Sequence, residues 1–306
     1  MKTKQLRIMT RILLLSGVIC YLIFSENTLP LCEKLRDFLF ALTSVFPYSV
    51  FEAFILLIPI ALFFLLKAVN ANFIKKSTVI AFVFLLGTYF VNIVIPYRAA
   101  APQNSYEKCS EEQYMRAVYL LSSEIASLSP TTFSLKATLP YGAKASMLSR
   151  VCTALGISGL YYFPTAEYVV NTDAPAYICT FCAAHEYSHF NSVMREDEAN
   201  LNAYMLLLSS DDSFYRYSAY LYAFELISSS LCKSNYVSQD ELLALIPDFA
   251  RRDILSHKQY AESYKCGFFH KISLKLNGSL QSLNDKRGGA SYSASASLIC
   301  NYILSR

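Results

Sequence analysis

The sequence predicts a mainly α-helical protein in two parts: three N-terminal transmembrane helices, then a helix-rich α+β domain with a small edge sheet. Three observations support this prediction. The first hundred residues hold three long apolar runs, which raise the mean hydropathy of the 306-residue chain to +0.31. The rest shows apolar residues mainly at helical spacing, with one aromatic and β-branched segment typical of a strand. About two hundred residues are enough for one independent core.

The three apolar runs cover about residues 8–24, 48–66 and 78–95. Each is close to the roughly 20 residues that a helix needs to cross a bilayer. The basic start of the first run is typical of a signal peptide, but no small-residue cleavage site follows Phe24. We therefore interpret residues 1–97 as a membrane anchor with three transmembrane helices.

The charges of the short loops predict the orientation of this anchor. The N-terminus is purely basic and the loop after the second run carries Lys67, Lys75 and Lys76, whereas residues 26–47 mix both signs. Basic loops stay in the cytoplasm, so we expect a cytoplasmic N-terminus and, after three crossings, an extracytoplasmic C-terminal domain. The lipid bilayer is then one partner. The net charge of +4 is dispersed along the chain, which argues against a nucleic-acid partner.

Residues 98–112 are rich in small and polar side chains and are interpreted as a linker, which leaves 113–306 as the domain. Apolar spacing and stop signals predict its elements. The expected helices cover about residues 111–128, 143–155, 176–190, 195–208, 213–230, 239–245, 247–266 and 291–304, the expected strand covers 161–171, and a loop is expected at 277–289.

The strongest chemical signal is the sequence His185-Glu186-Tyr187-Ser188-His189. Two histidines four residues apart on a helix project from one face, so both imidazoles can reach one tetrahedral zinc ion. The acid directly after the first histidine lies beside that face and can act as general base toward water. The structural alternative is a buried histidine pair without a metal. We favour zinc because two of the four histidines in the chain share this spacing.

Zinc of this kind needs a third protein ligand, and the start of the next helix supplies two candidates. We favour Glu196 and keep Glu198 as the competing ligand, since acids in a first helical turn also stabilise the helix dipole. A turn at Asn191 and Ser192 would bring that helix back to the metal, and asparagine tolerates the left-handed conformation such a turn needs. The remaining histidines, His257 and His270, are remote alternatives.

The segment Glu196-x-x-Ala199-Asn200 resembles the helix that supplies the third ligand in gluzincin-type metallopeptidases, including the ImmA/IrrE-like and CAAX-protease-like groups. The resemblance implies that Glu196 binds zinc and that Asn200 supports the ligands from behind. It also implies a zincin-like fold for the domain.

Nearly the whole chain resembles an uncharacterised bacterial family, domain of unknown function 3810. The matching features are the three N-terminal apolar runs, Asn171-Thr172-Asp173 with Pro175, the HExxH motif and the segment 195–200, with weaker matches at 216–218 and 291–292. That family usually has glycine in the turn between the two helices, where this chain has Ser192. The resemblance implies a zinc site in a bacterial cell membrane protein.

Two further roles follow from the zincin comparison. An edge strand beside the active-site helix would pair with extended substrate, and residues 167–171 lie at the matching place in the sequence. Tyrosines at 217 and 220 are candidates for stabilising an oxyanion. Each has a plain alternative, since strands and tyrosines most often serve only to pack.

Nine cysteines raise the question of disulfides. If the domain faces an oxidising compartment, some are expected to pair, although the sequence does not fix the connectivity. Cys179 and Cys182 precede the motif on an apolar helical run, which favours buried core residues or structural disulfides over a redox pair.

The sequence thus predicts a membrane-anchored, zinc-dependent metallopeptidase that hydrolyses peptide or protein substrates by a zinc-activated water, with Glu186 as general base. The alternative is a non-catalytic membrane sensor or binding protein with a structural or degenerate zinc site. A thiol-redox membrane protein is a third hypothesis, resting on Cys179 and Cys182.

Overall fold

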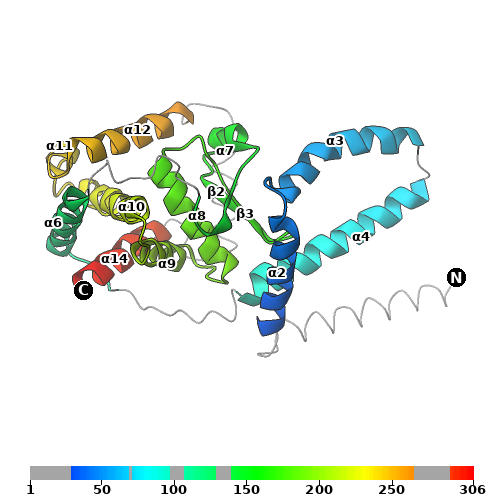
Figure 1. Ribbon diagram of the computed structural model, residues 1–306, viewed down its shortest axis with the longest axis horizontal. Helices are drawn as coiled ribbons and strands as arrows, with labels where there is room; N and C mark the ends of the chain where they lie inside the picture. Colours follow the sequence, from blue (N-terminus) through cyan, green and yellow to red (C-terminus); the bar gives the residue numbers. More distant parts are fainter. Residues whose placement is uncertain (1–28, 69–70, 97–106, 129–138, 265–289) are drawn as a thin grey trace.

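The computed structural model describes residues 29–68, 71–96, 107–128, 139–264 and 290–306 (Figure 1). It is mainly α-helical with one small three-stranded mixed sheet. At this level the predicted fold class is confirmed.

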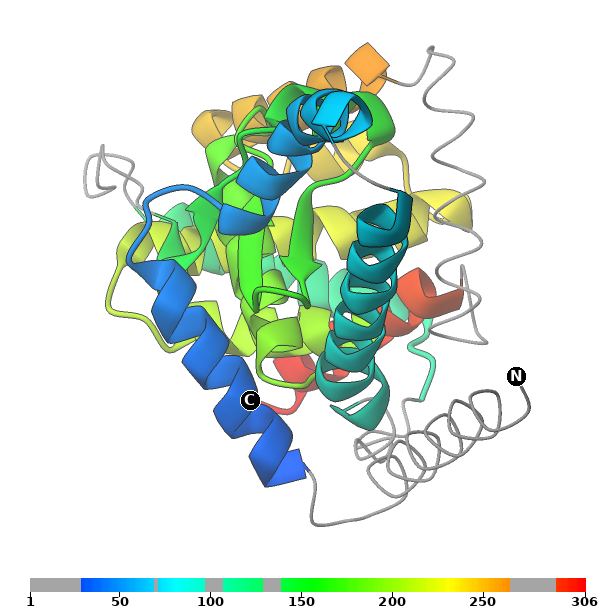
Figure 2. The same cartoon turned by 90° about the vertical axis from the view of Figure 1, so that its right-hand side faces the viewer.

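Three helices precede the domain: α2 (Leu29–Ser44), α3 (Val50–Ala68) and α4 (Ala71–Tyr89), the last continued by a short π-helical turn, η2 (Phe90–Val94). Figure 1 shows α3 and α4 extending away from the domain, while α2 lies along it. Seen from that side in Figure 2, the three helices lie in front of the green sheet. The sequence predicts no helix at α2, which lies in the segment between the first two predicted spans.

The predicted spans at 48–66 and 78–95 fall on α3 and on α4 with η2, and the span at 8–24 lies outside the described residues. Within the described parts of the chain, no helix combines the length and the apolar character needed to cross a membrane. The membrane anchor therefore stays a prediction.

All but one of the described helices of the domain begin and end close to the predicted positions. The first, α6, starts after Ser110, whose hydroxyl accepts from the Gln113 amide while the Gln113 side chain accepts from the Ser110 amide, a capping box. The others are α7 (Ser149–Leu155), α8 (Ala176–Phe190), α9 (Glu196–Leu208), α10 (Ser213–Lys233), α11 (Gln239–Leu243), α12 (Asp248–Tyr264) and α14 (Ala290–Leu304), and α6 itself covers Glu111–Ser127. The predicted loop at 277–289 lies outside the described residues, and so does the predicted linker as far as residue 106.

Two predicted elements differ from the structure. Residues 143–155 are not one helix, because β1 (Lys144–Ala145) comes first and α7 begins at Ser149. The single strand expected at 161–171 is a hairpin of β2 (Gly159–Tyr162) and β3 (Glu167–Val170). The chain reverses between these strands and Ala166 adopts a φ of +54°, a conformation that aromatic and β-branched spacing does not reveal.

The strand order is β1-β3-β2, with β3 parallel to β1 and antiparallel to β2. Every residue of β3 is buried, whereas every residue of β2 is partly exposed. Helix α8 packs against the sheet on one side and against α9 and α10 on the other. Because α8 lies between these layers, the motif that it carries is held by the domain core.

Two buried carboxylates join α3 to the sheet. Glu167 of β3 accepts from the backbone amides of Val50 (2.9 Å) and Phe51 (3.0 Å) at the start of α3, and from the ammonium of Lys144 (2.7 Å). Glu52 of α3 accepts in return from the Ser146 hydroxyl at 2.6 Å and the Met147 amide at 2.6 Å. The carboxylate at the helix start also suits the positive end of its dipole. The base of α3 is thus part of the domain.

Candidate metal centre

Helix α8 presents the two motif histidines on one face. Their ring centroids lie 4.6 Å apart with an interplanar angle of 86°. Both side chains are largely buried, at 14% and 13% exposure for His185 and His189. This one-turn spacing follows from the helical period alone.

A tight turn after Phe190 returns the chain to the metal face. Ser192 adopts a φ of +70°, whereas Asn191 has a φ of −83°. The amides of Ser192 and Val193 donate to the carbonyls of His189 and Ser188, both at 3.0 Å. The left-handed residue is therefore Ser192. The sequence favours Asn191 for this conformation, and that expectation is wrong. Hydrogen bonds through the turn hold a conformation that serine rarely adopts.

Helix α9 begins at the residue that completes the group. The Glu196 carboxylate lies 3.2 Å from Nε2 of His185 and 3.8 Å from Nε2 of His189. One ligand atom from each of the three residues lies within 4.8 Å of the other two. The Glu196 side chain is 45% exposed, so the group opens toward solvent.

The outer nitrogens of both imidazoles are occupied by protein acceptors. Nδ1 of His185 lies 2.9 Å from the side-chain oxygen of Asn200, and Nδ1 of His189 lies 2.8 Å from the carbonyl of Val193. With these nitrogens donating, Nε2 of each ring is the atom that faces Glu196. A protonated Nε2 can donate to the carboxylate, and a deprotonated Nε2 carries the lone pair that a metal binds. The tautomer suited to metal binding is thus favoured by the surroundings.

Asn200 is itself held in place from behind. It is buried, and its amide donates to the hydroxyl of Ser295 on α14 at 3.0 Å. A second tie between the two site helices runs from the Asn202 amide to the hydroxyl of Ser188 at 3.0 Å. Ser295 could not be predicted from local sequence patterns, because it lies 95 positions from its partner.

Glu186 lies beside the group in a buried position, 6% exposed. Burial raises its pKa to about 7, the charge of His189 lowers it and that of Glu196 raises it. A carboxyl group with a pKa near neutrality is suited to accept and return a proton. Its surroundings thus match the general-base role proposed from the sequence.

Glu196 titrates in the opposite direction. Burial raises its pKa, but the hydrogen bond with His185 and the charges of His189 and His185 outweigh this and bring it to about 2. The carboxylate is therefore ionised at neutral pH, the form that binds a metal.

The backbone of β2 closes over Glu186. A methyl group placed on Gly159 would lie 2.5 Å from the sulfur of Cys182 and 2.9 Å from both Cγ and Oε1 of Glu186. Only glycine lets the strand approach the helix this closely. A glycine that begins a strand is the signal that could have identified this position.

The donor set fits a zinc ion. Zinc takes imidazole nitrogen and carboxylate oxygen at about 2 Å in tetrahedral geometry, which places ligand atoms roughly 3 to 4 Å apart. The separations of Glu196 from the two histidines lie in that range, at 3.2 and 3.8 Å. In the described residues, His185, His189 and Glu196 form the group of metal-ligand side chains whose ligand atoms lie within 4.8 Å of one another, and Glu198 is not in it.

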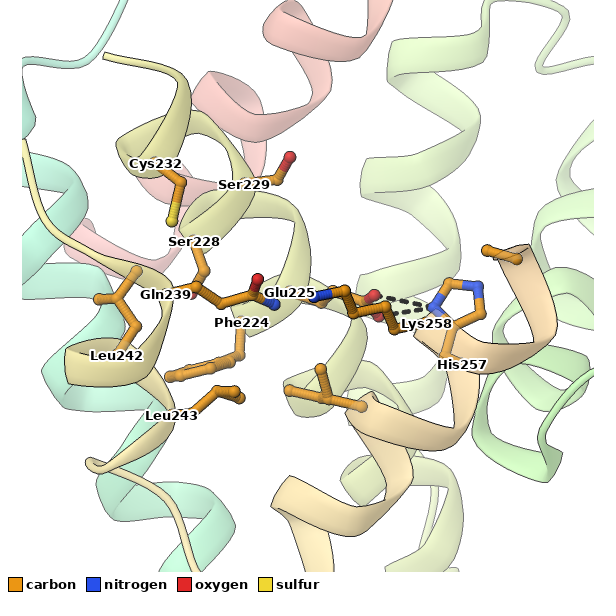
Figure 3. Close-up of a pocket in the computed structure, with 12 residues that line it drawn as sticks. Phe224, Glu225, Ser228, Ser229, Cys232, Gln239, Leu242, Leu243, His257 and Lys258 are labelled. Carbon is orange, nitrogen blue, oxygen red and sulfur yellow. Dashed lines mark hydrogen bonds and ion pairs between the residues drawn. The ribbon is translucent and has the colours of Figure 1, made fainter. Parts of the chain in front are cut away.

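His257, a remote alternative ligand, belongs to a different part of the domain. It lines a cavity of about 280 Å³ between α10, α11 and α12 (Figure 3). Its Nδ1 lies 2.8 Å from the carboxylate of Glu225, which also accepts from the hydroxyl of Tyr177 at 2.8 Å. His270 lies outside the described residues.

The tyrosines considered as oxyanion donors are engaged in packing. Tyr217 is fully buried and donates to Asp253 at 2.6 Å. Tyr220 is hydrogen-bonded to Glu124 of α6. Both hydroxyls thus have hydrogen-bond partners on neighbouring helices, and the oxyanion role stays a prediction.

The segment expected to be the edge strand, residues 167–171, does not lie at an edge of the sheet. Residues 167–170 form β3, which is central and paired on both sides. The strand beside α8 with one edge unpaired in the described sheet is β2. Residue order along the chain suggested β3, but only the hairpin decides which strand lies at the edge.

The seven described cysteines are free thiols: Cys32, Cys109, Cys152, Cys179, Cys182, Cys232 and Cys300. Cys179 donates to the carbonyls of Asn171 (3.3 Å) and Ala174 (3.2 Å), and burial raises its pKa to about 12. Burial raises the pKa of Cys182 as well. Both therefore act as core residues rather than as a reactive pair.

Fold and site together define a mainly α-helical protein with a partly open His-His-Glu group beside a buried glutamate. The chain belongs to the family described as protein of unknown function, DUF3810, whose model matches residues 98–300. No curated protein and no solved structure gives a significant match.

Proposed function

We propose that the protein is a zinc-dependent peptidase. The observation that carries the proposal is the meeting of His185, His189 and Glu196 within 4.8 Å beside the buried carboxyl of Glu186. Two imidazoles, one carboxylate and an open side are the donor set of catalytic zinc sites, whereas structural sites are closed by four protein ligands.

Each residue has a distinct role in this proposal. His185, His189 and Glu196 would hold the ion, and the hydrogen bonds to Asn200 and the Val193 carbonyl would orient the imidazoles. Bound zinc supplies a Lewis acid that makes water nucleophilic near neutral pH. Glu186 would take a proton from that water and pass it to the leaving amine.

The edge of β2 that is unpaired in the described sheet supports a peptide as substrate. An extended chain can add to such an edge through main-chain hydrogen bonds. Because β2 begins at Gly159, directly against Glu186, a peptide on this edge would pass the general base. The class of substrate is therefore an extended peptide or an unfolded protein segment.

We further propose that the protein acts at a bacterial membrane, with the domain outside the cytoplasm. The supporting observation is the exposure of consecutive apolar side chains on α3 and α4, since water-soluble surfaces rarely carry large apolar patches. These include Phe54, Ile55, Leu56, Leu57, Ile58, Ile60, Ile80, Phe82, Val83, Phe84, Leu85 and Leu86. Extraction of membranes at alkaline pH tests this proposal.

The peptidase proposal is tested with Glu186→Gln in the purified full-length protein. We expect one zinc per chain to be retained, with hydrolysis of a random library of fluorescence-quenched peptides reduced by roughly 100-fold or more, the usual contribution of general acid–base catalysis. Zinc content is measured by elemental analysis and hydrolysis by fluorescence.

A matched pair of variants checks the third ligand. Glu196→Gln should lose zinc, whereas Glu198→Gln, two positions further in the same first turn, should keep it. Full hydrolysis by Glu186→Gln would contradict the mechanism. Zinc binding by the wild-type protein without any hydrolysis would favour the non-catalytic sensor instead.

A further inference from the structure

The turn between the two metal-site helices is contacted from outside the domain by α2. Arg36 is 8% exposed, and its guanidinium donates to the hydroxyl of Ser192 at 3.0 Å. The central carbon of this guanidinium, Cζ, lies 4.5 Å from the centroid of the Phe190 ring. One side chain thus contacts the last residue of α8 and the left-handed residue of the turn.

Asp37 fixes the guanidinium from its other side. Its carboxylate accepts from Nε and Nη2 of Arg36 at 3.1 and 2.9 Å. Arginine suits this position because its planar group can pair with a carboxylate, donate to a hydroxyl and lie over a ring at once. Arg36 therefore makes three kinds of contact at once: an ion pair with Asp37, a hydrogen bond to Ser192 and a cation–π contact with Phe190.

The contacted turn leads directly into the candidate ligands. Ser192 donates its amide to the carbonyl of His189, and the next residue, Val193, offers its carbonyl to the ring of His189. Glu196 starts α9 shortly after. A change in the φ of Ser192 would therefore move the hydrogen-bond acceptor of one ligand and the position of another.

Packing around Arg36 keeps α2 in register with this turn. The ring of Phe40, one helical turn further along α2, lies 5.0 Å from that of Phe190 and 5.7 Å from that of Tyr168 on β3. The opposite face of α2 exposes apolar side chains at helical spacing. They are Leu31, Leu35, Phe38 and Leu42. Along its described length, α2 therefore packs against the domain with one face and exposes the other.

We propose that Arg36 is a positioning residue for the metal centre: it holds the Ser192 turn so that His189 and Glu196 keep their separation. The proposal rests on the proposed zinc site. If Arg36 has this role, the zinc affinity of the site depends on how α2 packs against the domain. Arg36 lies outside residues 98–300, the region that the family model matches.

The test measures zinc affinity of the full-length protein by competition with a chromophoric chelator. Arg36→Ala should weaken binding by roughly tenfold or more, the usual effect of removing a group that orients a ligand. Lys34→Ala, on the exposed side of the same helix, should leave the affinity unchanged. Cobalt in place of zinc adds a visible spectrum whose bands should shift in Arg36→Ala.

A double variant separates positioning from general stability. If Arg36 acts through the hydroxyl, Ser192→Ala should weaken zinc binding as well, and adding Arg36→Ala should cost less than its effect alone. The single serine change also provides a test if Arg36→Ala fails to fold. Zinc affinity and cobalt spectrum equal to wild type in both single variants would overturn the proposal. Absence of zinc binding in the wild-type protein would instead refute the proposed function.

Discussion

At the scale of single residues, the site contains two carboxyl groups whose surroundings differ. Glu196 faces two imidazoles and has a pKa near 2, whereas Glu186 is buried and has a pKa near 7. Environments that separate the pKa values of neighbouring acids are typical of sites where one acid binds and the other transfers protons. The arrangement would let one group stay ionised while the other takes up a proton.

The raised pKa of Glu186 predicts a pH-dependent stability of the metal-free protein. Its pKa in the folded state, about 7, lies above the ordinary value of 4.5. The folded state therefore binds the proton more tightly, so the stabilisation is fully present below pH 4.5 and is lost as the pH rises through 7. The loss is about 3 kcal/mol, since each pKa unit corresponds to about 1.4 kcal/mol.

Urea unfolding in the presence of a chelator measures this effect at pH 5 and pH 8. Wild type should lose stability between the two, and Glu186→Gln should lack that share of the loss. Glu196 does not interfere, because its lowered pKa acts only between about 2 and 4.5. An identical loss in both proteins would show that Glu186 does not titrate in this window.

At the scale of elements, the edge strand and the motif helix depend on one glycine. An added methyl at Gly159 would approach the Cys182 sulfur to 2.5 Å, closer than real contacts allow, so either the strand or the two α8 side chains must shift. Overpacking of this kind typically costs 1–3 kcal/mol. None of the three atoms nearest to this methyl belongs to a metal ligand.

We therefore predict that Gly159→Ala reduces peptide hydrolysis at least about tenfold while zinc content stays at wild-type level. A displaced general base lowers kcat, and a distorted edge raises KM, so both are measured. Gly87, where an added Cβ meets nothing within 4 Å, provides the matched control as Gly87→Ala. Wild-type kinetics in Gly159→Ala would mean that β2 can move away without affecting Glu186.

At the scale of the whole molecule, the N-terminal helices are both attached to the domain and unlike it. Glu167 and Glu52 tie the base of α3 to the sheet through buried hydrogen bonds. Beyond that base, α3 and α4 extend outward (Figure 1). Their apolar side chains are largely exposed where the structure describes them. The position of the domain is therefore coupled to whatever surface these helices contact.

If that surface is a bilayer, the full-length protein should stay with the membrane pellet after washing at alkaline pH. Peripheral proteins are released by this treatment, whereas helices buried in lipid are retained. Protease added to cells with a permeable outer layer should then digest the domain, since we place it outside the cytoplasm. Release into the supernatant would contradict the membrane proposal, and protection from protease would contradict the orientation.

Local patterns explain what could be predicted. The bounds of α8 and α9 follow from apolar spacing and stop signals, and the histidine pair follows from the helical period, because each depends on residues only a few positions apart. The hairpin was not predicted because the residue with positive φ in its turn is Ala166, whereas glycine or asparagine usually marks such a position. The same applies to Ser192, where tertiary contacts hold a conformation that local preference disfavours.

The sequence by itself thus determined that His185, Glu186 and His189 share one helix and that an acid-rich helix follows. Only the tertiary structure decided that Glu196 rather than Glu198 meets them and that β2 rather than β3 forms the edge. It also decided that Arg36 reaches the turn from 156 positions away. The physical reason is that helical geometry acts over one turn of chain, whereas these three outcomes depend on how separate elements pack.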